Sequence, residues 1–206
     1  MVTVTNKKAI YENEQKECCK WVRYKIIGNR KMRRWNGKFS IGGGKKSLLV
    51  KLKSSETIAC TLDTDKLTTD DLAELFRKTQ TDFPFLCEEK VRTDYAQKLA
   101  AHADFVVCRH EGSAVGYIAM YTNQPPLCYI TMVSVLPGYK RCGISQALLL
   151  YMSQKALQSG CSYLRLEVKK ANTPAIRAYE KFGFEMTGES TDTSFFMEKR
   201  IGWRSD

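Results

Sequence analysis

The amino-acid sequence predicts an α/β (α+β) domain with a mixed, mostly antiparallel central sheet of about six or seven strands and about four helices. Two observations predict this fold class. Apolar stretches on either side of Glu111-Gly112, a turn signal, predict an antiparallel hairpin. Further along the chain, strand and helix patterns alternate, which implies parallel pairing through a right-handed crossover. Because antiparallel pairs come first, the sheet is mixed.

Local patterns place each element in order. The first helix is expected after the capping oxygens of residues 68–71, with Leu72, Leu75 and Phe76 on one face, and it ends before Phe83-Pro84. Gly160 and Gly183 are expected to end two later helices. The expected strands are residues 57–62, 104–109, 114–121, 127–135, 163–168, 184–186 and 194–199, and the later helices are residues 88–101, 144–157 and 173–182.

The positive charge of the chain, +11 in all, lies in its N-terminal quarter. Residues 1–56 hold 15 Lys+Arg and 4 Asp+Glu, whereas residues 57–206 hold 18 of each. We therefore predict a basic, poorly ordered N-terminal extension over residues 1–55 and a folded domain over residues 56–203. The short apolar stretches 21–27 and 47–52 have the composition of strands but no obvious partner within this arm.

Three interpretations of the arm remain open. It is a loosely packed extension, a segment attracted to an acidic surface such as nucleic acid or anionic lipid, or sequence that precedes a later start at Met32. Nucleic acid is expected as a partner only through this arm. No stretch approaches the roughly 18 apolar residues of a membrane span, and charges fill the first 30 residues, so we expect a cytoplasmic protein.

The eight cysteines contain no CxxC pair and no Cys/His set at metal-ligand spacing, which argues against a zinc site. No metal is expected. Several cysteines lie in apolar stretches, where a free thiol behaves as a small hydrophobic side chain. Since disulfide frameworks belong mostly to much shorter secreted chains, we interpret all eight as reduced core residues.

The most informative segment is residues 133–148, Val-Ser-Val-Leu-Pro-Gly-Tyr-Lys-Arg-Cys-Gly-Ile-Ser-Gln-Ala-Leu. A strand runs into a tight basic turn and then directly into a helix, so several backbone N–H groups point at one place and form an anion site. Gly143 permits close approach of a ligand, and Lys140 and Arg141 add positive charge. A pyrophosphate fits this site, although an ordinary basic turn before a helix has the same pattern.

This turn resembles the acetyl-CoA signature of the GNAT acetyltransferases. Lys140 stands at the signature's Arg or Gln position, Gly143 matches its glycine, and Ser145 replaces its last small residue. A second block also resembles the family, at the distance expected of its closing signature. It consists of Leu164-Arg-Leu-Glu-Val168 followed by Asn172, Ala175, Tyr179, Lys181, Gly183 and Phe184. The resemblance implies that strands 127–135 and 163–168 are parallel and splay apart.

The resemblance further implies that acetyl-CoA is the acetyl donor, with its pantetheine arm between the splayed strands and paired to their free backbone groups. Asn172 would hold the cofactor near its thiol end, or is simply a helix-start residue. The residues expected at the cofactor are Val133, Ser134, Val135, Lys140, Arg141, Cys142, Gly143, Ile144, Ser145, Asn172 and Tyr179.

The implied reaction is direct attack of a primary amine on the thioester. An amine with a pKa near 10 must lose a proton first, and the oxyanion needs fixed donors. The family position of Tyr179 implies an acid for the leaving thiolate, although aromatic residues at helical spacing usually fill cores. Glu167 is a candidate base because it interrupts an apolar strand. Alternatively, it lies at a wet strand end or pairs with Arg165 or Lys169, and a water chain is the base.

The acceptor is the least determined part of this prediction. An amino sugar, a polyamine or drug-like amine, and a protein N-terminus all remain open, as does the choice between a monomer and a homodimer. Family architecture nominates Phe83, Phe85, Tyr95, Glu189, Asp192 and Ser194 for the acceptor site. A different class of function, an acetyl-CoA-binding sensor whose basic arm contacts nucleic acid, also fits the sequence.

Overall fold

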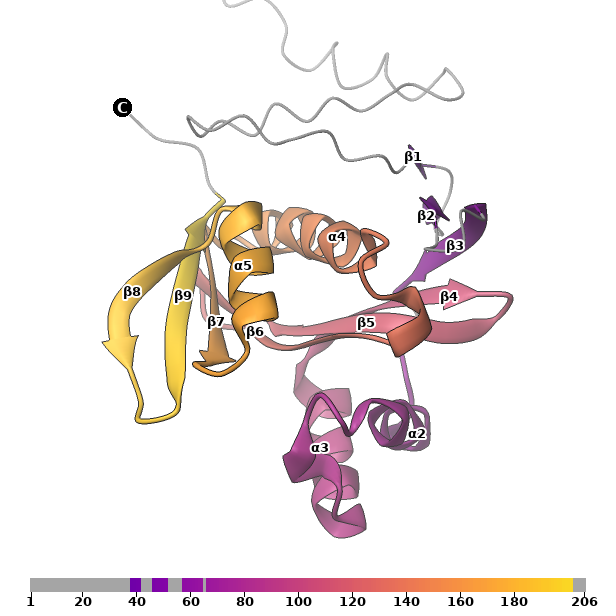
Figure 1. Cartoon of the computed structure of the whole chain (residues 1–206), viewed down its shortest axis with the longest axis horizontal. Coiled ribbons are helices and arrows are strands. Elements are labelled where there is room, and N and C mark those ends of the chain that lie inside the picture. The colour runs from indigo at the N-terminus through magenta and orange to yellow at the C-terminus, as the bar shows by residue number, and fades with distance from the viewer. Residues whose placement is uncertain (1–37, 42–45, 52–56, 65, 202–206) are drawn as a thin grey trace, which may run out of the picture.

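The computed structural model describes residues 38–41, 46–51, 57–64 and 66–201. They form one nine-stranded sheet with the strand order β1-β2-β3-β4-β5-β6-β7-β9-β8 (Figure 1). Every neighbouring pair is antiparallel except β6 and β7, which are parallel. The strands are β1 (Lys38–Ile41), β2 (Lys46–Lys51), β3 (Thr57–Asp63), β4 (Asp104–His110), β5 (Ser113–Tyr121), β6 (Leu127–Val135), β7 (Tyr163–Lys169), β8 (Glu185–Ser190) and β9 (Ser194–Arg200).

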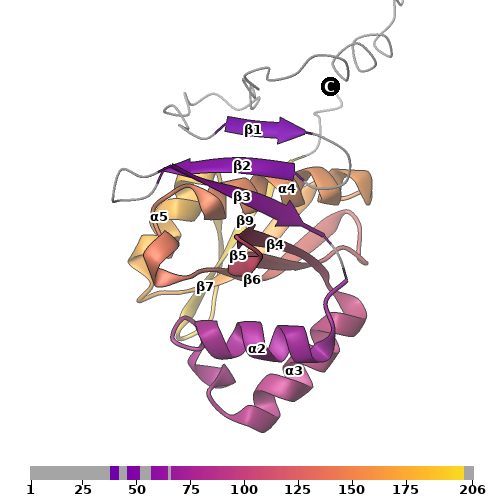
Figure 2. The same cartoon turned by 90° about the vertical axis from the view of Figure 1, so that its right-hand side faces the viewer.

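Helices cover both faces of this sheet, with α2 and α3 on one side and α4 and α5 on the other (Figures 1 and 2). Their bounds are α2 (Thr69–Thr79), α3 (Glu89–His102), α4 (Ile144–Gln158) and α5 (Thr173–Phe182), with short 3-10 turns η1 (Pro84–Leu86) and η2 (Pro137–Tyr139). Two buried clusters result, one between the sheet and α4 and α5, the other between the sheet and α2 and α3. The predicted fold class is confirmed, since β3 to β9 and the four helices follow the expected order.

Residues next to the helices fix where they begin and end. Thr68 caps α2 because its hydroxyl accepts from Asp71 N at 3.1 Å, while the Asp71 carboxylate accepts from Thr68 N at 3.1 Å. Gly183 ends α5 with a φ of 93°, in the left-handed region that favours glycine. Lys199 from β9 donates to Phe182 O at 2.6 Å, which satisfies a carbonyl at the same helix end.

The sheet crosses the predicted boundary between residues 55 and 56. Strand β2 pairs with β3 along its whole length, from Lys46 with Leu62 to Lys51 with Thr57. The expectation that the stretch 47–52 has no partner within the arm is wrong, because β2 pairs there with β1, from Lys38 with Leu49 to Ile41 with Lys46. On its other side β2 pairs with β3 of the domain. Residues 1–37, with the stretch 21–27 and Met32, lie outside the described residues. The two-part division of the chain and the poor order of its beginning therefore stay predictions.

The prediction that all cysteines are reduced is wrong for two of them. Cys128 and Cys161 form a disulfide, with their Cα atoms 5.9 Å apart. It joins the start of β6 to the residues just before β7, where the two parallel strands come together. Cys60 and Cys108 are buried free thiols as expected, whereas the free Cys87 is exposed. Cys142 is also free, and Cys18 and Cys19 lie outside the described residues.

None of the helices in the described part of the chain is long and apolar enough to cross a membrane. Within the same part of the chain, no group of three or more His, Cys, Asp or Glu side chains could hold a metal ion.

Candidate functional site

The two parallel strands of the sheet, β6 and β7, separate halfway along their length. β6 and β7 pair from Leu127 with Tyr163 to Ile130 with Leu166, and no further. Thr131 is an extra residue in β6, because Ile130 pairs with Met120 of β5 while Met132 pairs with Ala119. Among the described strands, β6 beyond this bulge pairs only with β5, and β7 only with β9. The predicted splay is therefore present, with its apex at Thr131.

The splay leaves part of the β6 backbone without a partner in the sheet. Leu136 N donates to Val115 O, so in the alternating antiparallel ladder the main-chain groups of Ser134 also face β5. Those of Val133 and Val135 then point away from β5, into the opening. Unpaired strand groups of this kind can pair with an extended ligand.

A turn with unusual backbone angles closes the wide end of the opening. Arg141 has a φ of 68° and Gly143 a φ of 85°, and Gly143 is the N-cap of α4. No side chain of the described residues caps this helix. The first-turn N–H groups, including those of Ile144 and Ser145, thus lack helical acceptors and carry the positive end of the helix dipole. The turn has the geometry of an anion site.

Lys140 does not point freely into this turn. Its Nζ lies 2.8 Å from Oδ1 of Asp82, in the loop between α2 and η1. The other carboxylate oxygen of Asp82 accepts a hydrogen bond from Ser134 Oγ at 2.8 Å. Asp82 therefore ties the anion turn and the splayed strand to the helices on the other face. No sequence signal marks Asp82, because its partners lie 52 and 58 residues away along the chain.

Comparisons with known proteins agree with this geometry. The sequence profile of the Acetyltransferase (GNAT) family matches residues 69–184, more than half of the chain. The chain belongs to the GNAT acetyltransferase family. Among solved structures, the ribosomal-protein-S18-alanine N-acetyltransferase of Escherichia coli has the same fold, with a TM-score of 0.59, 22% identity, and 71% of this chain and 97% of that chain covered.

Curated relatives with higher identity match over shorter stretches. The streptothricin acetyltransferase of Streptomyces lavendulae is 33% identical over 85 residues, 41% of this chain and 45% of that protein. An N-alpha-acetyltransferase of Sulfurisphaera tokodaii is 34% identical over 96 residues, 40% of this chain and 57% of that protein. The matched region thus spans about half the length of these relatives.

Within this GNAT chain, Tyr179 lies on α5 and packs against the β6 and β7 core. Its ring contacts Phe184 edge-on, with the centroids 5.7 Å apart. Burial raises the pKa of Tyr179 to about 12, so its hydroxyl keeps its proton at neutral pH. Among the described residues this hydroxyl has no hydrogen-bond partner. Tyr179 therefore holds an available proton.

Asn172 stands at the start of the same helix. Its Oδ1 accepts from Ala175 N at 3.3 Å, so it is the N-cap of α5. The helix-start interpretation of Asn172 is thereby confirmed, and contact with a cofactor stays a prediction.

Glu167 is not the buried carboxylate that the apolar strand suggested. Its side chain is exposed, on the face opposite α5, while Leu166 and Val168 point into the core. It follows the last residue of β7 that pairs with β6, so it stands at the apex of the opening. Arg165 does not pair with it, because Arg165 donates to Glu198 at 2.9 Å and also bonds Glu189. The structure therefore supports the alternative of a solvent-facing Glu167.

Three of the residues nominated for the acceptor come together. Phe85 packs edge-on against both Phe83 and Tyr95, at centroid distances of 6.3 and 5.4 Å, and is 52% exposed. Tyr95 Oη lies 2.6 Å from Oγ1 of Thr131, the bulge residue, and burial raises the pKa of Tyr95. An aromatic wall thus runs from the surface to the apex of the opening.

The other three nominees are scattered. Glu189 is paired with Arg165, and Asp192 is exposed in the turn between β8 and β9. Ser194 is fully buried, and its hydroxyl has no hydrogen-bond partner among the described residues.

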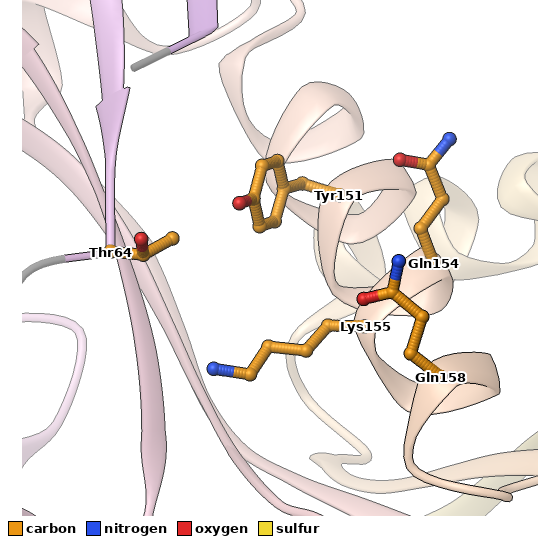
Figure 3. Close-up of a pocket in the computed structure, with 5 residues that line it drawn as sticks. All are labelled: Thr64, Tyr151, Gln154, Lys155 and Gln158. Atoms are coloured by element: carbon orange, nitrogen blue, oxygen red, sulfur yellow. The ribbon is translucent and has the colours of Figure 1, made fainter. Parts of the chain in front are cut away.

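A pocket of about 240 Å³ lies on the other side of the sheet and belongs to none of these features (Figure 3). Thr64, after β3, and four residues of α4 line it. Lys155 is one of them and forms an ion pair with Asp104 at 2.7 Å. Because it adjoins neither the anion turn nor the apex, we assign it no part in the reaction.

Proposed function

We propose that this chain is an N-acetyltransferase that moves an acetyl group from acetyl-CoA to a primary amine by direct attack. The observation that carries the proposal is the opening between β6 and β7, which ends at the uncapped N-terminus of α4. Such an opening fits a ligand with a strand-like arm and a diphosphate. Membership of the GNAT family supports the same donor.

The proposed donor site uses mostly backbone. The N–H groups of Gly143, Ile144 and Ser145, together with the Arg141 side chain, bind the diphosphate. Val133 and Val135 offer their free main-chain groups to the pantetheine amides, and a free N–H there donates to the thioester oxygen as negative charge develops. Lys140 acts indirectly, by holding the turn through Asp82.

The proposed proton transfers use one residue on each side of the sheet. The amine nitrogen forms a bond to the thioester carbon, the C–S bond breaks, and the departing thiolate takes the proton of Tyr179. The amine proton leaves toward Glu167, through water because that side chain is exposed. The high pKa of Tyr179 suits an acid that must still be protonated at neutral pH.

The acceptor is open between a small molecule and a peptide. One relative is named a streptothricin acetyltransferase and another an N-alpha-acetyltransferase. For this chain, we propose both kinds of acceptor, a small-molecule amine and the N-terminus of a peptide, as candidates. The aromatic wall ends at the surface in the exposed Phe85, where either kind of acceptor can reach it.

The test combines binding and turnover. Acetyl-CoA affinity is measured by calorimetry, and release of free thiol is followed with a panel of primary amines. Tyr179→Phe should lower kcat by about 100-fold, the low end of general-acid effects, with little change in acetyl-CoA affinity. Tyr163→Phe, an exposed tyrosine at the far end of β7, is the matched control. Unchanged turnover in Tyr179→Phe removes the acid role, and no affinity for CoA compounds overturns the proposal.

A further inference from the structure

A second pocket, of about 420 Å³, lies beneath the sheet between α3 and the first half of β6. Leu127 and Tyr129 of β6 and Tyr121 of β5 form its inner wall, and these side chains are half-buried. Tyr121 and Tyr129 stand directly opposite each other in the antiparallel ladder. Exposed side chains of α3 and of the loop between β5 and β6 form its rim.

Two rows of side chains connect this pocket with the apex of the opening between β6 and β7. Residues two apart on a strand share a face, so Thr131 at the apex lies in one row with Tyr129 and Leu127. Residues three and seven apart on a helix also share a face, so Tyr95 lies in one row with Lys98 and His102. The contact between Tyr95 and Thr131 joins the two rows at the apex. The two rows of side chains therefore lead from the pocket to the apex, where the proposed reaction takes place.

The charges along these two rows change sign. Glu167 stands near the apex, close enough to Tyr129 for its charge to act on that phenol, and Arg165 beside it is engaged by two carboxylates. At the other end, the described residues that line the pocket include Lys98 and His102 and no Asp or Glu. Two side-chain amides, from Asn123 and Gln124, complete the rim. A cation and several neutral donors suit an anionic or polar group.

We propose that this pocket binds a carboxylate or phosphate group of the acceptor, so that the substrate is an amine with a negative charge at its other end. This inference rests on the proposed acetyl transfer. Lys98 and His102 lie about 4.5 and 10.5 Å along the helix from Tyr95, which sets the spacing between amine and anion at roughly 5–10 Å. Glu167 attracts the ammonium end while Lys98 holds the anionic end, which fixes the direction of binding.

The experiment compares acceptors that differ only at the far end. Aminohexanoate and aminohexyl phosphate carry the anion, aminohexanamide is the neutral match, and hexanediamine carries a second cation. With the full chain, kcat/KM should be about three- to tenfold higher for one or both anionic members than for the amide, and lowest for the diamine. High salt should reduce this preference, because the rim is exposed.

Variants of α3 assign the preference to the pocket. Lys98→Gln should remove most of the preference through KM, and Lys98→Glu should favour the diamine over the acid. Lys90→Gln is the matched control, an exposed lysine on the same helix outside the pocket. Acetylation of acid, phosphate and amide at equal rates by the wild type would overturn the inference alone, as would a preference that survives Lys98→Gln. Acetyl-CoA binding without acetylation of any member would also overturn the inference alone, whereas no affinity for CoA compounds would overturn the proposed function.

Discussion

Asp82 offers a sharp test of how the donor site is held. Replacing Asp82 by Ala removes two contacts of 2.8 Å, one from the Ser134 hydroxyl and one from the Lys140 ammonium. Ser134 is only 3% exposed, and its strand carries the free backbone groups of the opening. The variant should therefore lose both stability and affinity for acetyl-CoA.

The magnitude follows from the two environments. A buried hydroxyl left without a partner costs about 1–3 kcal/mol. The ion pair is worth about 0.2–1 kcal/mol, because the side chains of Lys140 and Asp82 are 45% and 31% exposed and solvent screens them. At about 2–4 °C per kcal/mol for a domain of this size, Tm should fall by roughly 2–16 °C. The Kd for acetyl-CoA should rise about fivefold, if about 1 kcal/mol of preorganisation is lost.

A double-mutant cycle separates the two contacts. With Ser134→Ala as background, no hydroxyl remains to be stranded, so Asp82→Ala should cost only the ion pair, at most about 1 kcal/mol. Asp94→Ala, an exposed carboxylate on α3, is the matched control. The measurements are thermal unfolding and calorimetric titration with acetyl-CoA. Equal costs of Asp82→Ala in both backgrounds would refute the account of Ser134.

Three further perturbations test the packing around this site. A Cβ at Gly116 would lie 3.1 Å from Ser134 O, so Gly116→Ala should destabilise by about 1–2 kcal/mol in urea unfolding, and wild-type stability would contradict this. Burial lowers the pKa of Lys199 from 10.5 to about 8, so the unfolded chain holds the extra proton between these values and wild-type stability should rise with pH there. Relative to Lys199→Met, the free energy of unfolding of the wild type should rise by about 1–3 kcal/mol over this pH range. Partial solvent access and the hydrogen bond to Phe182 O reduce the size of this rise, and parallel pH profiles of the two proteins would contradict it. Dithiothreitol should lower the Tm of the wild type, because the Cys128 disulfide closes a separation of 33 residues, but not that of Cys128→Ala; equal responses would show that no disulfide forms.

Features encoded by consecutive residues could be predicted from the sequence. The strand, basic turn and helix around Gly143 are local, and so is the box that caps α2, so both were found. The outward orientation of Glu167 was also within reach. Apolar residues alternate with Arg165 and Glu167 in β7, and a period of two places those charged side chains on one face. The prediction took β7 to be buried on both faces and therefore missed the outward orientation of Glu167.

Features that depend on distant residues could not be predicted in the same way. Strand β2 pairs with β1 on one side and with β3 on the other. Because β3 lies across the segment where the charge pattern changes, composition suggested a boundary inside a continuous sheet. Cys128 and Cys161 meet only because β6 and β7 are neighbours in space. Asp82 belongs to no sequence motif, because both of its partners are distant along the chain. Each needs the tertiary arrangement before its role can be recognised.

Two long-range side-chain hydrogen bonds explain how β6 stays in place after it separates from β7. β6 loses its β7 partner after Ile130, and this would leave the donor strand supported on one side only. Tyr95 of α3 bonds Thr131 at the apex, and Asp82, after α2, bonds Ser134 three residues further on. The helices beneath the sheet thus replace the missing strand with side-chain hydrogen bonds, and the opposite side of the opening stays free. Since α3 also carries Lys98, the same helix that fixes the apex also sets the distance from it to the pocket.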